Sequence, residues 1–317
     1  MKLGFVTAIL PDLELEEVVA FAAAEGFGCI EVMCWPAASG DTRRYAGVSH
    51  IDVDGFSDDD AERINSMLEN HGVEISGLGY YPNPLVPDAA ERKTYTDHIR
   101  KVISASAKLG VNVMNSFVGR DPTKPIEAQW DLFEEVRKPI VAHAESEGVE
   151  IGIENCPMLF SLDEWPGGKN LAISPAVWRE MFERIPSPNF GLNFDPSHLH
   201  WQQIDSSAAL WEFSDRIVHV HVKDERIDVA KLQDEGILGL GWHVPKIPGL
   251  GDIDWDEYFR TLADIGWDGP AVIEVEDRAF EDSLDGRKEA IRHSKRYLDA
   301  VLERGYLSQA RNAGTSS

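Results

Sequence analysis

Residues 217–224 read IVHVHVKD, an apolar β-like run in which alternate side chains carry polar or charged groups. A buried strand should not hold an imidazole or a carboxylate without a partner, because taking a charge out of water costs several kcal/mol. Three other runs in the second half of the chain have a carboxylate near the C-terminal end: residues 149–155 (VEIGIEN), 190–195 (FGLNFD) and 271–276 (AVIEVE). Together these runs predict successive buried strands that share one polar site.

The polar exceptions in these runs are Glu154, Asp195, His221 and Glu274. A divalent cation is the simplest partner that would compensate all of them together. Three of them also have an ordinary interpretation: a carboxylate paired with lysine for Glu154, a helix cap or turn for Asp195, and a hydrogen-bonded core histidine for His221. Glu276 shares a face with Glu274, and Glu274 is preferred as the ligand because it lies deeper in the strand.

Strand alternation places these candidates on one face. Gly152 has the parity of Glu154, and Asn193 has that of Asp195, whereas Ile153 and its counterparts take the opposite face. Small or polar side chains are therefore expected inside a barrel and large apolar ones toward its helices. His219 lies about 7 Å below His221 by strand rise, and it is predicted to be a buried group that supports the ligand.

Strand-like and helical patterns alternate from one end of the chain to the other. Strands are predicted at Leu3–Thr7, Cys29–Met33, Glu74–Gly79, Val111–Phe117, Val149–Glu154, Phe190–Asp195, Ile217–Lys223 and Ala271–Val275. Helices are predicted at Glu14–Glu25, Asp58–His71, Ala89–Leu109, Ile126–Glu147, Pro175–Ile185, Ser207–Ser214, Asp254–Ile265 and Arg287–Arg304. Ser57 and the pair Ser174-Pro175 are predicted helix starts, and glycine follows most of the helices.

This alternation predicts an α/β protein with a single (β/α)8 TIM barrel. The alternative is an open doubly wound sheet, but the turn after the first strand, Thr7-Ala8-Ile9, lacks the glycines of a phosphate-binding turn. Residues 1–305 are predicted to form the barrel, and residues 306–317 a flexible C-terminal tail. The long glycine- and proline-rich connection 226–252 follows the seventh strand and is expected to cover a substrate.

The composition is that of a globular protein with a large core, with 43% hydrophobic and 27% charged residues. The formal net charge of −25 argues against binding to nucleic acid or to an anionic membrane. Cys29, Cys34 and Cys156 have no disulfide or zinc-ribbon spacing and are interpreted as small apolar fillers. With no signal peptide pattern and no membrane-spanning run, a cytoplasmic location is expected.

At this point the chain resembles the xylose isomerase-like TIM barrels, which include ketose 3-epimerases, hydroxypyruvate isomerases and enzymes of inositol pathways. The resemblance covers residues 1–305. It depends on the motifs Ile153-Glu154-Asn155, Asn193-Phe194-Asp195-Pro196-Ser197-His198, His219-Val220-His221-Val222-Lys223-Asp224, residues 248–255 (PGLGDIDW) and Ile273-Glu274.

The resemblance implies that Glu154, Asp195, His221 and Glu274 hold one divalent ion, Mn²⁺ or Mg²⁺ first and Co²⁺ or Zn²⁺ next. It also implies that Glu154 and Glu274 are the catalytic acid–base pair. This chemistry is reasonable, because abstraction of a proton next to a carbonyl needs a positioned base and stabilisation of the resulting charge.

Four further residues are predicted to contact substrate. His198 matches a family histidine near the metal, with a solvated loop histidine as the alternative. Arg226 lies five residues after His221 where the epimerases have arginine at six, so a surface arginine is an equal alternative. Lys223 has the parity of His221 and is expected to contact substrate or a carboxylate. Trp35 follows the second strand and is expected to form an apolar wall or simple packing.

The predicted function is a metal-dependent isomerase or epimerase acting on a sugar or polyol-derived α-hydroxycarbonyl. A lyase or dehydratase acting on a keto-sugar or keto-inositol would use the same site. A DNA repair endonuclease of the same fold is a remote alternative, because the ends of strands two to four offer no histidine. A vestigial binding module is a further alternative. The expected partner is a small molecule, and the resemblance alone implies a homodimer or homotetramer.

Overall fold

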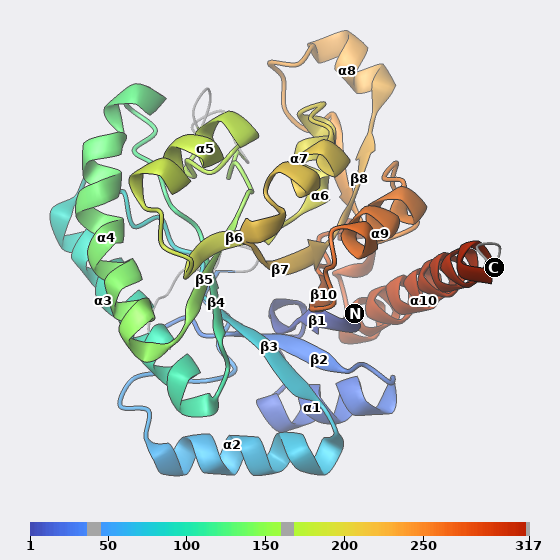
Figure 1. Ribbon diagram of the computed structural model, residues 1–317, viewed down its shortest axis with the longest axis horizontal. Coiled ribbons are helices and arrows are strands. Elements are labelled where there is room, and N and C mark those ends of the chain that lie inside the picture. Colours follow the sequence, from blue (N-terminus) through green and yellow to red (C-terminus); the bar gives the residue numbers. More distant parts are fainter. Residues whose placement is uncertain (37–45, 160–167, 315–317) are drawn as a thin grey trace.

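The protein is a closed parallel barrel surrounded by helices (Figure 1). The computed structural model describes residues 1–36, 46–159 and 168–314. Within these ranges the barrel strands are hydrogen-bonded in the order β1-β10-β7-β6-β5-β4-β3-β2. Their bounds are β1 Lys2–Val6, β2 Cys29–Met33, β3 Glu74–Gly79, β4 Val113–Ser116, β5 Glu150–Glu154, β6 Phe190–Phe194, β7 Ile217–Val222 and β10 Pro270–Ile273. The predicted (β/α)8 barrel is confirmed.

Helices follow the barrel strands and cover the outside of the barrel. Their bounds are α1 Leu15–Ala24, α2 Asp58–His71, α3 Ala89–Leu109, α4 Trp130–Glu147, α5 Pro175–Arg184, α6 Pro196–Trp201, α7 Ser206–Glu212, α8 Val229–Glu235, α9 Trp255–Asp264 and α10 Leu284–Gly314. The core lies between these helices and the strands: Phe5 of β1 packs edge-on against Phe21 of α1, with ring centroids 5.9 Å apart. Within the described residues, no helix has both the length and the apolar character needed to cross a bilayer.

The predicted helix boundaries are largely confirmed. The Ser57 hydroxyl accepts a hydrogen bond from the Asp60 amide at the start of α2, and the helix ends at Gly72 with φ of 66°. This left-handed conformation is one that glycine adopts without steric cost. Pro175 begins α5 as predicted, but Ser174 makes no side-chain capping bond to the described residues. The predicted helix start is therefore confirmed, with Ser174 at the N-cap position but without a side-chain capping bond.

The barrel lumen is polar below the mouth rather than filled by branched apolar side chains. Gly152 faces this interior, and a Cβ at that position would lie 2.3 Å from the Asn115 Oδ1. Asn115 and Asn193 are both fully buried there. The absence of a side chain at Gly152 therefore makes room for the buried amides. This agrees with the prediction that Gly152 faces the inside of the barrel.

The connection 226–252 is an ordered arm rather than an irregular loop. Strands β8 (Asp224–Ile227) and β9 (His243–Lys246) pair antiparallel, and α8 lies at the outer end of the arm (Figure 1). Asp224 fixes its base, because the carboxylate accepts hydrogen bonds from the Glu225 and Gly249 amides at 2.9 Å and from the Trp255 indole at 2.9 Å. A role as a substrate cover stays a prediction.

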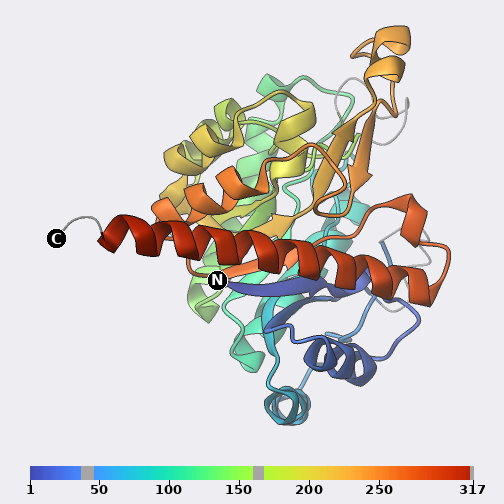
Figure 2. The same cartoon turned by 90° about the vertical axis from the view of Figure 1, so that its right-hand side faces the viewer.

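The C-terminal helix is longer than the sequence predicted. Helix α10 runs from Leu284 to Gly314 and crosses the outside of the barrel beside β1 (Figure 2). It extends over most of the segment 306–317 predicted as a tail, and residues 315–317 lie outside the described ranges. The flexibility of that tail stays a prediction. The three cysteines are buried and free, in agreement with their interpretation as apolar fillers.

Candidate metal centre

The structure brings the four candidate ligands together at the C-terminal end of the barrel. Glu154 ends β5, Asp195 directly follows β6, His221 lies in β7 and Glu274 directly follows β10. One ligand atom from each lies within 4.8 Å of the others. The His221 Nδ1 is 3.9 Å from both the Glu154 Oε1 and the Glu274 Oε2. Their convergence agrees with the sequence analysis, and their role as metal ligands stays a prediction.

Two atoms of this group are buried without a hydrogen-bond partner in the part of the chain that is described: the His221 Nδ1 and the Asp195 Oδ2. The other Asp195 oxygen accepts a hydrogen bond from the Ser197 amide at 2.8 Å and caps α6. Asp195 is thus a helix cap, and its other oxygen makes no hydrogen bond to the described residues but lies in ion-pair range of the Lys223 ammonium at 3.2 Å. A buried polar atom without a partner is costly. This set of one imidazole nitrogen and several carboxylate oxygens fits a divalent cation.

Lys223 supplies positive charge beside these carboxylates. Its Nζ donates a hydrogen bond to the Glu274 Oε2 at 2.6 Å, and it lies 3.0 Å from the Glu276 Oε2 and 3.2 Å from the Asp195 Oδ2. Burial alone would lower the pKa of Lys223, but the carboxylates, Asp195 first, raise it well above its usual range. The expected pairing of Lys223 with a carboxylate is therefore observed.

His198 lies inside the site rather than in a solvated loop. Its Nε2 is 3.4 Å from both the Glu154 Oε1 and the Asp195 Oδ2, and it accepts a hydrogen bond from the Lys223 ammonium at 3.1 Å. Burial, reinforced by the nearby Lys223, lowers the pKa of His198 to about 4. The imidazole is therefore neutral near pH 7, with Nδ1 carrying the proton.

A cavity of about 340 Å³ opens above the ligands. Glu154, His221 and Glu274 line it together with Lys223. Its walls are largely apolar and include Trp35, Tyr81, Phe117 and Met158. Trp35 is 7% exposed and packs edge-on against Tyr80 at 4.9 Å, so it both packs and forms a wall, as the two interpretations of the sequence required.

Arg226 does not reach this site. Its side chain is exposed on β8 and does not line this cavity. The alternation of side chains along β8 explains the placement, because the neighbouring Glu225 is buried and points the opposite way. Arg278, which follows β10, lines the cavity instead. The surface interpretation of Arg226 fits the structure.

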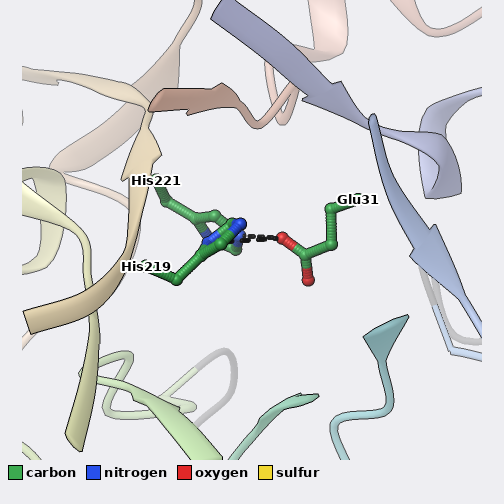
Figure 3. A group of neighbouring side chains, drawn as sticks. All are labelled: Glu31, His219 and His221. Carbon is green, nitrogen blue, oxygen red and sulfur yellow. Dashed lines mark hydrogen bonds and ion pairs between the residues drawn. The ribbon is translucent and has the colours of Figure 1, made fainter. Parts of the chain in front are cut away.

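Glu31 of β2 is a member of this site that sequence reasoning missed (Figure 3). It is completely buried, and its Oε2 lies 2.6 Å from the His221 Nε2. The Tyr81 hydroxyl donates to the other Glu31 oxygen. Burial alone would raise the pKa of Glu31, but the charge and hydrogen bond of His221 outweigh it and lower the pKa to about 2. The signal was present in the sequence as one carboxylate in the apolar run 29–33.

Glu31 decides which nitrogen of His221 faces the other ligands. An ionised carboxylate only accepts hydrogen bonds, so the His221 Nε2 must carry the proton in the bond to Glu31. The Nδ1 is then the atom that faces Glu154 and Glu274. A carboxylate behind a ligand imidazole is a common arrangement in metal sites.

His219 completes the layer below the ligands. It is fully buried, and its two ring nitrogens lie 3.0 Å from the Asn193 Oδ1 and 3.1 Å from the Ser76 Oγ. Glu31, His219 and His221 are close enough to bind an ion together, but hydrogen bonds already occupy the facing atoms. The predicted burial of His219 is confirmed, and its role in supporting the ligand stays a prediction.

The titration of the ligands predicts pH-dependent ion binding. Burial raises the pKa of Glu154 and of Glu274 to about 7, and the Glu31 carboxylate raises that of His221 to about 10 against the effect of burial. Because an ion displaces these protons, affinity should rise from pH 5 to 9, with about one to three protons released per ion. Calorimetric titration with Mn²⁺ in buffers of different ionisation enthalpy measures this release. A pH-independent affinity would contradict the ligand assignment.

Comparisons with known proteins agree with this fold. A family model described as a xylose isomerase-like TIM barrel matches residues 19–301. YfiH of Bacillus subtilis, an uncharacterized protein, is 27% identical over 87% of this chain and 93% of its own length. A ketose 3-epimerase of Arthrobacter globiformis is 26% identical over 70% of each chain. An inosose dehydratase of Clostridium perfringens is 32% identical over 30% of this chain and 33% of its own.

Among solved structures, the IolI protein with a bound zinc atom superposes with a TM-score of 0.69. The superposition covers 96% of this chain and 99% of that one, at 19% identity, and it supports the fold. The match of the family model to most of the chain, together with the closed barrel, places this protein in a family. The chain belongs to the xylose isomerase-like TIM barrels.

Proposed function

We propose that this protein is a divalent-metal-dependent isomerase or epimerase of a sugar or polyol-derived α-hydroxycarbonyl. The observation that carries the proposal is a pair of carboxylates, the buried Glu154 and the half-buried Glu274, that both approach the unpartnered His221 Nδ1 at the bottom of a cavity. The similarity to a ketose 3-epimerase supports the same reaction class.

Glu154 and Glu274 are suited to carry protons. Burial raises the pKa of each to about 7, so each can take or return a proton near neutral pH. They come from opposite sides of β7, since β10 pairs with β7 directly and β5 lies on the other side beyond β6. Two carboxylates that approach a bound sugar from different sides can remove a proton from one face and return it to the other.

Glu154, Asp195, His221 and Glu274 are the residues that would hold the ion, with Mn²⁺ or Mg²⁺ the first choices and Co²⁺ or Zn²⁺ the next. When bound, such an ion supplies Lewis-acid stabilisation for negative charge on substrate oxygens. His198 contributes a neutral imidazole within 3.4 Å of Glu154, placed to hydrogen-bond a substrate oxygen. The apolar walls limit access of water to the proton-transfer groups.

A dehydratase acting on a keto-sugar or keto-inositol is the second candidate function. It is favoured by the Lys223 ammonium, which lines the cavity and donates a hydrogen bond to Glu274 at 2.6 Å. Elimination of water needs stabilisation of the departing hydroxyl as well as a base, and the Lys223 ammonium can donate a hydrogen bond to that hydroxyl. The similarity to an inosose dehydratase supports this alternative.

Exchange of solvent deuterium into candidate substrates tests the proposed function. The purified protein is incubated in D₂O with Mn²⁺ and a panel of ketoses, keto-inositols and hydroxypyruvate, and the products are analysed by NMR. Label at one carbon with an inverted centre indicates an epimerase, and loss of water indicates a dehydratase. If no member of the panel exchanges or loses water, and thermal unfolding does not respond to EDTA, the proposal is wrong.

The variant Asp195→Asn is expected to bind Mn²⁺ about tenfold more weakly or worse, because a neutral amide oxygen replaces a carboxylate. Asparagine is also a good N-cap, so α6 should keep its start. Asp205→Asn is the matched control, since Asp205 caps α7 away from the site. Calorimetry with Mn²⁺ measures both variants. Equal affinity for Asp195→Asn and wild type would remove Asp195 from the ligand set.

A further inference from the structure

A second cavity of about 390 Å³ lies beside the one above the candidate ligands. The two cavities share wall residues on the segments that follow β5 and β10, namely Cys156, Met158, Glu276 and Arg278. The base of the β8–β9 arm and residues of α6 form its other walls. A molecule seated over the ligands can therefore extend under the arm.

Helix α6 connects the two cavities through residues one turn apart. His198 lies 3.4 Å from the Glu154 and Asp195 carboxylates, and Trp201 lines the second cavity three positions later. Residues at this spacing share a helix face and are separated by about 4.5 Å along the axis. The separation of His198 and Trp201 is therefore short enough for both residues to contact adjoining parts of one ligand.

The second cavity has a flat aromatic wall. The rings of Trp201 and His243 are stacked, with centroids 4.5 Å apart and planes at 12°. Trp242 packs edge-on against both rings, at 6.2 and 5.1 Å, and its indole donates a hydrogen bond to the Gly239 carbonyl. The stacked pair is held in place from the arm, and an aromatic face is suited to the apolar face of a sugar ring.

Carboxylate oxygens in the same wall have unused capacity to accept hydrogen bonds. Asp277 is 1% exposed, and its Oδ1 accepts from Lys246 at 2.8 Å, whereas its Oδ2 has no partner among the described residues. Glu225, also 1% exposed, has an Oε1 whose near neighbour is the His243 Nδ1 at 3.3 Å. Acceptors of this kind need donors such as hydroxyl groups, and they repel phosphate or carboxylate groups.

From the aromatic wall and these acceptors we infer that the second cavity is a subsite for a neutral sugar ring, so that the substrate is a glycosylated α-hydroxycarbonyl rather than a free monosaccharide. The inference depends on the proposed function for the reacting end of the molecule. It adds the Trp201 face and the Asp277 carboxylate as the groups that recognise the second ring.

Deuterium exchange with paired substrates tests the subsite. D-Fructose is compared with lactulose, maltulose and isomaltulose, in which the same ketose carries a galactose or glucose ring. At least one of these keto-disaccharides is expected to show kcat/KM about tenfold or more above that of fructose. Trp201→Ala should remove about tenfold of this advantage and leave fructose within twofold, because one aromatic contact is lost at the second ring only.

Two further variants separate recognition from folding. Trp201→Phe keeps an aromatic face and should recover most of the advantage, and Trp211→Ala on the exposed side of α7 should change nothing, since Trp211 is 55% exposed. If Trp201→Ala lowers fructose and disaccharide turnover equally, or if all three disaccharides react more slowly than fructose, the subsite is wrong.

A binding measurement distinguishes this failure from failure of the proposed function. Calorimetric titration of the Mn²⁺-loaded protein with the same four sugars needs no turnover. Binding of a disaccharide at least tenfold tighter than fructose, with loss in Trp201→Ala, supports the subsite even if no exchange occurs. Exchange of fructose without any tighter disaccharide binding overturns the subsite and leaves the proposed reaction in place.

Discussion

Glu154→Gln and Glu274→Gln are each expected to lower solvent deuterium exchange by roughly 10²–10⁴-fold, the usual contribution of a positioned acid or base. The amide keeps the shape of the carboxylate and an oxygen that faces the ion, but it cannot accept a proton near neutral pH. Exchange is measured by NMR on the best substrate of the panel, and Mn²⁺ content is measured on the same samples so that a loss of metal is seen separately.

Glu150→Gln is the matched control for this pair. Glu150 begins the strand β5 that Glu154 ends, so the same substitution is made in the same strand at the opposite end of the barrel. It should exchange like the wild type. Exchange at the wild-type rate in both Glu154→Gln and Glu274→Gln would show that neither carboxylate moves the proton.

Glu31→Gln is expected to weaken Mn²⁺ binding by about 10–100-fold, the usual cost of losing the group behind a ligand imidazole. Glutamine can still accept the hydrogen bond from the His221 Nε2. Without the carboxylate charge, however, the Nδ1 lone pair binds a metal ion less strongly. The variant should remain folded, because the hydrogen-bonding shape of the lumen is kept. Calorimetry with Mn²⁺ gives the affinity, and circular dichroism checks the fold.

The control for Glu31 is Glu74→Gln on β3, which removes an exposed ion pair with Lys2 and should leave Mn²⁺ affinity unchanged. A second measurement separates orientation from general damage: nitrogen NMR of labelled histidine should report the proton of His221 on Nε2 in the Mg²⁺-loaded wild type, where the ion has displaced the proton from Nδ1. Unchanged affinity together with an unchanged proton position in Glu31→Gln would show that Glu31 does not orient the ligand.

The architecture could be predicted because it repeats. Each strand of the barrel needs a doubly buried apolar run, and helices α2, α3 and α4 each end at a glycine of positive φ, so the same local pattern recurs along the chain. Asp195 shows where a single pattern leaves two outcomes open. The sequence allowed a cap or a ligand, and the structure gives one oxygen to the cap and leaves the other facing the site.

Glu31 and Arg226 show what the sequence could not settle. Glu31 carries the same signal as the predicted ligands, but its partner is 190 positions away, and the pairing appears only when the closed barrel brings β2 across from β7. Arg226 was predicted to contact substrate because of its distance from His221 along the chain. That spacing does not determine the side-chain direction once β8 pairs with β9, because pairing fixes which residues turn outward.

The proposed double use of Asp195, as a helix cap and an ion ligand, would link ion loading to sugar recognition. Its carboxylate anchors the first turn of α6, and the same short helix carries His198 and Trp201. Any shift of that carboxylate when the ion leaves would be transmitted to both side chains through a helix of six residues. Sugar affinities measured after a chelator has removed the ion would therefore come from a protein whose sugar-binding side chains are less well held. Affinities that bear on turnover should be measured on the ion-loaded protein.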